Sequence, residues 1–219
     1  MKKSINRREL SRRAALLTGA AAAATSTGSL AALTRTPSQT PGPFYPDTMP
    51  AETDVDLTLL DGHSERAVGD VILVRGRVLD DNGNPLANAR VDIWQTNHYG
   101  RYDHPDDKNP APLDPNFQGF GVCMTDAEGR YGFRTIKPAP YPLDAMNDVG
   151  TRPRHIHFRV SHDSADELTT QMYFAGDPLI EDDVVMKDTP ADQRHLLITV
   201  TDVDDETSLP LHHFDITLA

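Results

Sequence analysis

Two histidines in a short apolar run are the residues of this chain best suited to chemistry. His155 and His157 flank Ile156 and are followed by Phe158, Arg159 and Val160, a run typical of a β-strand. Side chains at positions i and i+2 of a strand point to the same face, so both imidazoles can reach one point. The pair suits a metal ion, although two polar residues on the wet face of a half-buried strand have the same pattern.

Two tyrosines and an arginine are further residues that can bind a metal or take part in catalysis. Tyr141 stands between two prolines, which stiffen the backbone around it. Tyr102 lies in a polar turn just after the apolar run at 91–94. The spacing is 39 residues from Tyr102 to Tyr141, then 14 and 16 residues to the two histidines, and Arg152 stands three residues before the first of them.

This set resembles the iron site of the intradiol ring-cleavage dioxygenases, with the protocatechuate 3,4-dioxygenase branch as the nearer match. The resemblance covers roughly residues 40–180, at fixed mutual spacing. Further segments that look like family landmarks are Gly42-Pro43-Phe44-Tyr45, Asp92-Ile93-Trp94-Gln95, Gly100-Arg101-Tyr102, the runs at 112–117 and 133–138, Thr125-Asp126, Arg152-Pro153 and Gln171-Met172-Tyr173-Phe174.

The resemblance implies that Tyr102, Tyr141, His155 and His157 bind ferric iron, Fe(3+), with a hydroxide as a further ligand. A phenol titrates near pH 10 in water, so a neutral tyrosine is a poor ligand at pH 7. A bound trivalent cation stabilises the phenolate and overcomes this. Hard anionic oxygens together with two imidazoles also favour ferric iron over softer metal ions.

The implied activity is a dioxygenase reaction on an aromatic 1,2-diol. In the family the diol binds the iron through both oxygens, Tyr141 leaves the metal, and O₂ attacks the activated ring carbon. The bond between the two hydroxylated carbons then breaks and gives a muconate-type diacid. Arg152 would stabilise negative charge on the ring, and Gln171 would lie near the substrate.

Four residues depart from the family pattern at positions expected to affect the substrate pocket. Leu143 stands where the protocatechuate enzymes tend to carry tryptophan. Arg154 and the pair His98-Tyr99 replace small residues. We therefore expect an altered pocket wall and an aromatic diol, of catechol or protocatechuate type, rather than a specific substrate.

Two other classes of protein remain open as alternatives. A secreted, catalytically inactive β-sandwich binding module, similar to transthyretin, would share the strand pattern but needs no Tyr/Tyr/His/His set. A zinc hydrolase or a ferrous oxygenase could use the two histidines with Asp103 or Asp148.

The remaining aromatic and histidine residues have simpler interpretations. Tyr45 and Tyr99 do not fit the ligand spacing, and Trp94 is expected in the core. Strand packing is expected for Tyr131 and Tyr173, surface positions for His98, His104 and His162, and a solvated strand end for His212-His213.

Composition describes an ordinary globular protein with an unusual charge distribution. The 219 residues are enough for one domain or two small ones, and 17 prolines with 14 glycines suit an all-β fold. Residues 1–36 carry seven Lys/Arg and one acidic residue, whereas the remainder has 14 basic and 32 acidic residues, a charge of −18. An acidic body of this kind argues against nucleic acid as a partner.

The first 35 residues are predicted to be an export signal. Arg12 and Arg13 precede a weakly hydrophobic, alanine-rich run at 14–24, which looks like a twin-arginine signal; a basic disordered tail is the alternative. The protein is then exported, periplasmic or secreted, in a bacterium, which suggests plant- or lignin-derived phenolics as substrates. Residues 36–50 form an extended lead-in and 51–219 the domain. We expect no membrane-spanning segment, and an oligomer with itself or a related subunit, as in the family.

Short strands separated by turn residues predict a β-sandwich of eight or nine strands with long site-building loops. A hairpin is expected between 71–79 and 89–96, and another between 121–126 and 130–136. The loop at 97–120 carries Tyr102 and is expected to build the site. The other predicted strands are 54–60, 154–161, 168–174, 195–201 and 214–218, with one helical turn near 180–186.

Overall fold

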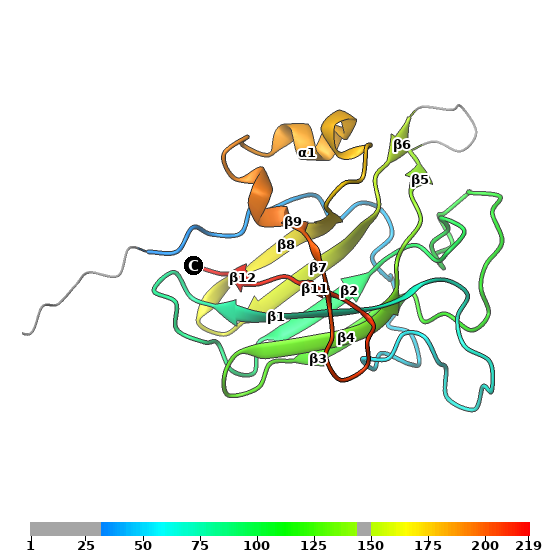
Figure 1. Ribbon diagram of the computed structural model, residues 1–219, viewed down its shortest axis with the longest axis horizontal. Coiled ribbons are helices and arrows are strands. Elements are labelled where there is room, and N and C mark those ends of the chain that lie inside the picture. The colour runs from blue at the N-terminus through cyan, green and yellow to red at the C-terminus, as the bar shows by residue number, and fades with distance from the viewer. Residues whose placement is uncertain (1–31, 144–149) are drawn as a thin grey trace, which may run out of the picture. The chain divides into compact units, whose positions relative to one another are not determined.

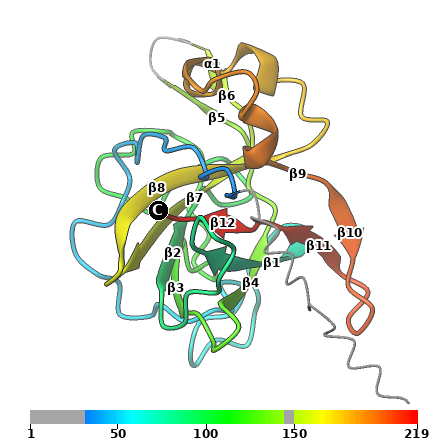
Figure 2. The ribbon, with the colours of Figure 1, turned by 90° about the vertical axis from the view of Figure 1, so that its left-hand side faces the viewer.

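The computed structural model describes residues 32–143 and 150–219. These residues form a β-sandwich of two mixed sheets with one short α-helix (Figures 1 and 2). The first sheet has the order β10-β11-β1-β12, and β4 pairs with β1 from the other side. Its strands are β1 (Val71–Leu79), β4 (Arg130–Ile136), β10 (Thr201–Val203), β11 (Pro210–His213) and β12 (Ile216–Thr217).

The second sheet, ordered β3-β2-β7-β8-β9, carries the two histidines. Its neighbours are antiparallel except for β8 and β9, which run parallel. The strands are β2 (Arg90–Trp94), β3 (Phe120–Met124), β7 (His155–His162), β8 (Ala165–Phe174) and β9 (Ile198–Thr199).

A two-stranded ribbon and a short helix lie beside the second sheet. The ribbon pairs β5 (Tyr141–Pro142) with β6 (Thr151–Arg152). Two 3₁₀ turns, η1 (Ile180–Asp182) and η2 (Arg194–Leu197), flank the helix α1 (Val184–Asp188) in the chain. Both views place α1 close to the ribbon (Figures 1 and 2).

Strand alternation separates the core from the site. Ile156, Phe158 and Val160 of β7 are fully buried in the main hydrophobic cluster between the sheets. His155 and His157 therefore point to the other face of the same strand. A second aromatic cluster, which contains Trp94 and Tyr102, lies on that side.

The predicted β-sandwich is confirmed, but both predicted hairpins are wrong. The turn after β1 does form, because Leu86 N–H donates to Val78 O, and Asn88 then adopts a left-handed φ of 61°. Beyond it β2 joins the opposite sheet, where it pairs with β3 and β7, while β4 pairs with β1. Both short turns therefore connect strands of opposite sheets.

Three smaller strand predictions also differ from the structure. Residues 54–60 make a single bridge at Asp56 rather than a strand. The predicted strand at 195–201 begins as η2 and continues as the short β9 and β10, and the one at 214–218 is β12, preceded by β11. The helical turn near 180–186 is confirmed as η1 and α1. Within the described residues no helix is long and apolar enough to cross a membrane.

The N-terminal stretch falls into two parts. The predicted signal lies almost entirely in residues 1–31, outside the described residues. The lead-in runs along the sandwich instead, where Thr36 N–H donates to Thr217 O and Gln39 N–H to Thr169 O.

Candidate metal centre

The four residues singled out for their chemistry converge at the outer face of the second sheet. The rings of Tyr102 and Tyr141 have centroids 5.4 Å apart, and those of Tyr141 and His155 are 5.6 Å apart. The Nε2 atoms of His155 and His157 are separated by 3.2 Å. All four side chains are at most 8% exposed. The geometry therefore places two phenols and two imidazoles around one buried point.

Both imidazoles are neutral at ordinary pH. Burial and, to a smaller extent, the Arg152 charge lower the pKa of His155 to about 3. Burial, His155 and Arg152 together hold the pKa of His157 well below its usual value. Nδ1 of His155 lies 2.7 Å from Pro153 O and must donate to it, so Nε2 carries the lone pair and faces His157 Nε2. A histidine held in this way has the tautomer that metal ligands use.

The two phenols are protonated unless a cation lies between them. Burial raises the pKa of Tyr102 well above 10, and the proximity of Tyr141 raises it further. Burial also raises the pKa of Tyr141, although the charge and a side-chain hydrogen bond of Arg152 oppose the increase. The Tyr102 hydroxyl is buried without a hydrogen-bond partner. An unpartnered phenol beside two neutral imidazoles fits a hard, highly charged cation.

Close contact between two loops sets the positions of the tyrosines. Gly100 has a φ of +81°, and a Cβ added to it would lie 2.6 Å from Pro140 O. Only glycine permits this approach. Thr96 Oγ1 donates to Ala139 O at 2.9 Å, which joins the loops a second time. The loop that carries Tyr102 is thereby fixed against the ribbon that carries Tyr141.

Strand register completes the surroundings of the histidines. Trp94 on β2 and Gln171 on β8 are the direct partners of His157, so the three side chains form one row on the same face. The Trp94 and His157 rings stack with centroids 4.7 Å apart and an angle of 5°. His155 is paired in the same way with Tyr173.

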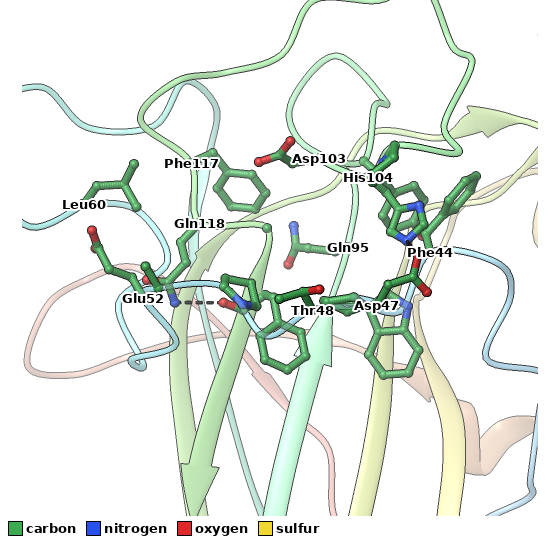
Figure 3. A pocket seen from close by; sticks show the side chains of 18 residues that line it. Phe44, Asp47, Thr48, Glu52, Leu60, Gln95, Asp103, His104, Phe117 and Gln118 are labelled. Carbon is green, nitrogen blue, oxygen red and sulfur yellow. Dashed lines mark hydrogen bonds and ion pairs between the residues drawn. The ribbon is translucent and has the colours of Figure 1, made fainter.

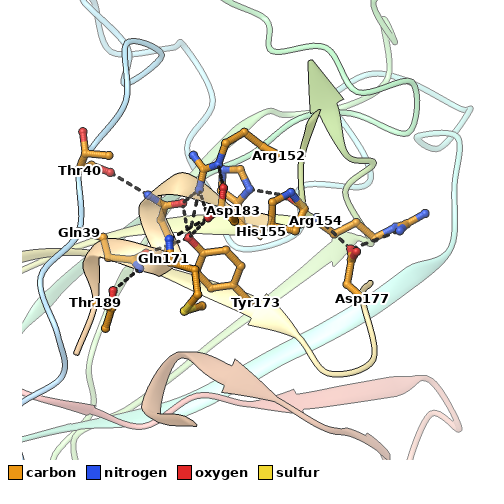
Figure 4. Close-up of polar contacts among 12 residues, drawn as sticks. Gln39, Thr40, Arg152, Arg154, His155, Gln171, Tyr173, Asp177, Asp183 and Thr189 are labelled. Carbon is orange, nitrogen blue, oxygen red and sulfur yellow. Dashed lines mark hydrogen bonds and ion pairs between the residues drawn. The ribbon is translucent and has the colours of Figure 1, made fainter. Parts of the chain in front are cut away.

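A buried polar network holds Arg152 in place (Figure 4). Asp183 accepts two hydrogen bonds from it, Nε to Oδ1 at 2.5 Å and Nη2 to Oδ2 at 3.1 Å. Nη2 also donates to Gln171 Oε1 at 2.8 Å and to the Tyr173 hydroxyl at 3.1 Å. Arg152 is also the β-ribbon partner of Tyr141. The guanidinium is therefore a fixed positive charge beside the tyrosine.

The lead-in covers this face of the sheet. Gln39 links the Tyr173 hydroxyl to Thr189, and Gln171 donates to Thr40 O at 2.9 Å. A Cβ on Gly42 would lie 3.6 Å from the His157 ring. Phe44 continues the cover, with its ring stacked on Tyr102 at 4.5 Å.

Comparisons with known proteins agree with this geometry. A family model described as "Dioxygenase" matches residues 40–219. The protocatechuate 3,4-dioxygenase beta chain of Burkholderia cepacia is 46% identical over 168 residues, which are 75% of this chain and 71% of that one.

The chain belongs to the intradiol dioxygenase family.

Some of the relatives are longer than this chain. Catechol 1,2-dioxygenase 2 of Acinetobacter lwoffii is 39% identical over 68% of this chain, and this chain spans about half of it (54%). Among solved structures, 3-chlorocatechol 1,2-dioxygenase of Rhodococcus opacus 1CP has a TM-score of 0.65 at 27% identity, covering 83% of this chain and 71% of that one. The dioxygenase domain of a carbohydrate-binding fusion from Streptomyces sp. SirexAA-E has a TM-score of 0.61 at 27% identity, covering 84% and 98%.

The residues that differ from the family pattern lie around the cluster of four candidate ligands rather than inside it. Leu143 is 46% exposed and directly precedes residues outside the described ranges. The Arg154 side chain forms an ion pair with Asp177 at 3.4 Å, and His98 is exposed. These positions can change the surface near the site without disturbing the candidate ligands.

Several predictions for other residues are wrong. His104 is 8% exposed rather than on the surface, because it lies against the Phe44 ring. His212 is 1% exposed, since it packs on Phe174 and bonds Thr199. Tyr173 does pack in the strand through its ring, as predicted, but its hydroxyl also accepts a hydrogen bond from Arg152.

The described residues give no support to a zinc hydrolase site or a ferrous oxygenase site. No group of three or more His, Cys, Asp or Glu side chains that could hold a metal occurs among them. Asp103 is exposed, and Asp148 lies outside the described ranges.

Sequence reasoning missed Asp183 and Gln39. The only signal at Asp183 is that of a helix N-cap, a role it does have, since its carboxylate accepts from Met186 N–H. Nothing in the sequence connects it with Arg152.

Proposed function

We propose that this chain is a non-haem Fe(III) dioxygenase that cleaves an aromatic 1,2-diol between its two hydroxylated carbons. Both atoms of O₂ enter the product, and each of the two carbons becomes a carboxyl group of a muconate-type diacid. The observation that carries the proposal is the convergence of Tyr102, Tyr141, His155 and His157 around one buried point.

These four residues would hold the iron, and their protonation states fit that role. The imidazoles are already neutral, whereas each phenol must lose its proton when the cation binds. When bound, ferric iron supplies the Lewis acidity that stabilises two phenolates and a chelated diol. The unpartnered Tyr102 hydroxyl supports its assignment as a ligand.

Other side chains would orient the substrate and balance its charge. Arg152 lies beside Tyr141 and keeps its positive charge, because its bonds to Asp183 raise its pKa against the effect of burial. It would stabilise negative charge on the Tyr141 oxygen and on the diol. Gln171 donates its amide N–H to Thr40 O and accepts from Arg152, so it fixes the edge of the site.

A visible spectrum of the purified, iron-loaded protein, recorded with and without catechol, tests this proposal. Phenolate bound to ferric iron absorbs visible light, so we expect a broad band that shifts when catechol binds. A colourless protein with stoichiometric iron would contradict the tyrosine ligands. A coloured protein that cleaves none of a broad panel of catechols, including lignin-derived phenolics, would contradict the activity and favour a binding module.

Export and assembly are separate parts of the proposal. We propose that residues 1–35 direct the protein out of the bacterial cytoplasm, and that it forms an oligomer with itself or with a related chain. Periplasmic fractionation of the wild type and of the Arg12→Lys, Arg13→Lys variant tests the first. Light scattering of the purified chain tests the second, and a monomer at micromolar concentration would contradict self-association.

A further inference from the structure

The Gln39 side chain ends inside the polar network around Arg152, although it comes from the lead-in (Figure 4). Its Oε1 lies 3.0 Å from the Tyr173 hydroxyl, and its Nε2 donates to Thr189 Oγ1 at 2.9 Å. Gln39, Tyr173 and Arg152 are 7%, 0% and 3% exposed. Buried polar groups need partners inside the protein, so the orientation of each of these side chains depends on its neighbours.

The Tyr173 hydroxyl has one proton and three acceptors within reach. They are Gln39 Oε1 and Gln171 Oε1, both at 3.0 Å, and Asp183 Oδ2 at 3.3 Å. Gln171 Oε1 and Asp183 Oδ2 already accept from Arg152 Nη2. Gln39 Oε1 has no other donor among the described residues, so the Tyr173 proton is directed to it.

This direction of the proton leaves the Tyr173 oxygen free to accept from Arg152. Nη2 donates to it at 3.1 Å. A hydroxyl that donates to one side chain and accepts from another orients both. Without Gln39, the proton would turn to one of the two acceptors that the guanidinium uses, and would compete with it there. Gln39 thus acts on Arg152 without a hydrogen bond to it.

Thr40, the next residue of the lead-in, acts on the same nitrogen of Arg152. Its carbonyl accepts from Gln171 Nε2 at 2.9 Å, which turns Gln171 Oε1 toward Nη2. Two consecutive residues of the lead-in therefore support the two neutral acceptors of Nη2, whereas Asp183 supplies the charged one. The lead-in sets the direction of the guanidinium, and Asp183 balances its charge.

The network lies apart from a cavity of about 400 Å³ beside Tyr102 (Figure 3). Lead-in residues between 44 and 52 line this cavity together with the loops at 102–105 and 117–120. Tyr102 is the one candidate ligand among the described lining residues, and neither Gln39 nor Arg152 is among them. A change at Gln39 therefore leaves the cavity wall unaltered.

We propose that Gln39 is a positioning residue for cleavage of the diol, and that it orients Arg152 through the Tyr173 hydroxyl. This inference rests on the proposed function, because the direction of the guanidinium affects the reaction only if the diol binds beside it. Nε and Nη2 of Arg152 are both bonded within the network, so Nη1 is the donor that remains for the Tyr141 oxygen and the diol. The lead-in is then part of the active site as well as its cover.

Steady-state kinetics of the iron-loaded, full-length protein test this role, with the catechol that the wild type cleaves best. Gln39→Met keeps the length of the side chain but removes both of its hydrogen bonds, and Tyr173→Phe removes only the hydroxyl. Each should lower kcat about tenfold with little change in KM, because a misdirected guanidinium stabilises the charge of the reacting ring less well. The double variant should be no slower than Tyr173→Phe, since Gln39 acts through that hydroxyl.

Thr170→Val is the matched control. Thr170 is fully buried and its Oγ1 donates to Pro37 O at 2.7 Å, so it also ties β8 to the lead-in, but it makes no bond to the network. The variant should lower the midpoint of thermal unfolding, as Gln39→Met does, and leave kcat unchanged. The visible band of the resting iron protein should be the same in all variants, because none of the four candidate ligands is altered.

A second measurement needs no activity. NMR of the metal-free, full-length protein follows solvent exchange of the Arg152 Nε–H, which is identified by the loss of its signal in Arg152→Lys. The exchange rate reports how firmly the guanidinium is held. It should be about three- to tenfold faster in Gln39→Met and in Tyr173→Phe, and unchanged in Thr170→Val.

Any of four results would overturn the inference. These are a kcat of Gln39→Met equal to that of Thr170→Val, multiplied losses of kcat in the double variant, an altered resting band in Gln39→Met, and wild-type exchange of the Arg152 Nε–H in both network variants. If the wild type cleaves none of the catechols, the proposed function fails, and the exchange rates alone decide whether Gln39 orients Arg152.

Discussion

Asp183 and Arg152 form a buried ion pair in which both carboxylate oxygens contact the guanidinium. The same carboxylate caps the N-terminus of α1. One residue thus joins a surface helix to the charge beside Tyr141.

Replacing Asp183 should affect both stability and catalysis. Asp183→Ala leaves the buried Arg152 charge without its partner and should lower the free energy of unfolding by about 3–5 kcal/mol. Asp183→Asn keeps a helix cap but removes the charge, so it should be less destabilised and still lower kcat. Urea unfolding and steady-state kinetics measure the two effects. An Asp183→Ala protein as stable as the wild type would contradict this account of the pair.

Tyr102→Phe and Tyr131→Phe should differ in their effects on stability and on the visible band. Both rings are buried, but the Tyr131 hydroxyl donates to Phe214 O, whereas the Tyr102 hydroxyl has no partner. Without metal, Tyr131→Phe should cost about 1 kcal/mol, and Tyr102→Phe should be neutral or slightly stabilising. With iron, only Tyr102→Phe should alter the visible band strongly. A destabilised metal-free Tyr102→Phe protein would show that this hydroxyl is partnered.

Gly100→Ala tests the contact between the two site loops. Gly176 is the matched control, since its φ is also +81° but nothing lies within 4 Å of an added Cβ. Gly176→Ala should cost about 1 kcal/mol of backbone strain. Gly100→Ala adds the clash with Pro140 O, about 1–3 kcal/mol more, and should also weaken iron binding. Equal losses of stability, measured by urea unfolding, would mean that the loops can separate freely.

His212 should make stability depend on pH. Burial and, to a smaller extent, the charges of Lys137 and His213 lower its pKa to about 4. Between about pH 6.5 and 4 the unfolded chain binds a proton here that the folded chain does not, so stability falls as pH decreases. His212→Gln should reduce this slope by up to about 1.4 kcal/mol per pH unit. Urea unfolding at pH 5 and 7 measures it, and an unchanged slope would contradict a neutral His212.

The parts of the site that depend on local sequence could be predicted. Strand alternation at His155-Ile156-His157 gives the shared face, and the resemblance to the family supplies the two tyrosines. The row of Trp94, His157 and Gln171 could not be predicted from pattern, because it requires the pairing of three strands. The wrong hairpins show the same limit, since a correct turn does not determine which sheet the next strand joins.

The residues that hold Arg152 illustrate long-range contacts without any local signal. Asp183 is 31 residues away in sequence, and Gln39 reaches the network from the other end of the domain. Their side chains have ordinary local roles, in a helix cap and in an extended segment. Only tertiary structure brings them to one place.

The position of the lead-in has a consequence for the order of assembly. Gln39, Gly42 and Phe44 cover the candidate ligands, and the segment is fastened by the Gln39 N–H bond to Thr169 O and by the bonds between Thr36 and Thr217. During synthesis the cover emerges before the ligands, whereas both of its anchors, Thr169 and Thr217, emerge after His157. All four candidate ligands therefore exist on the nascent chain before their cover can be fastened, which leaves an interval in which a metal ion can reach them from that side.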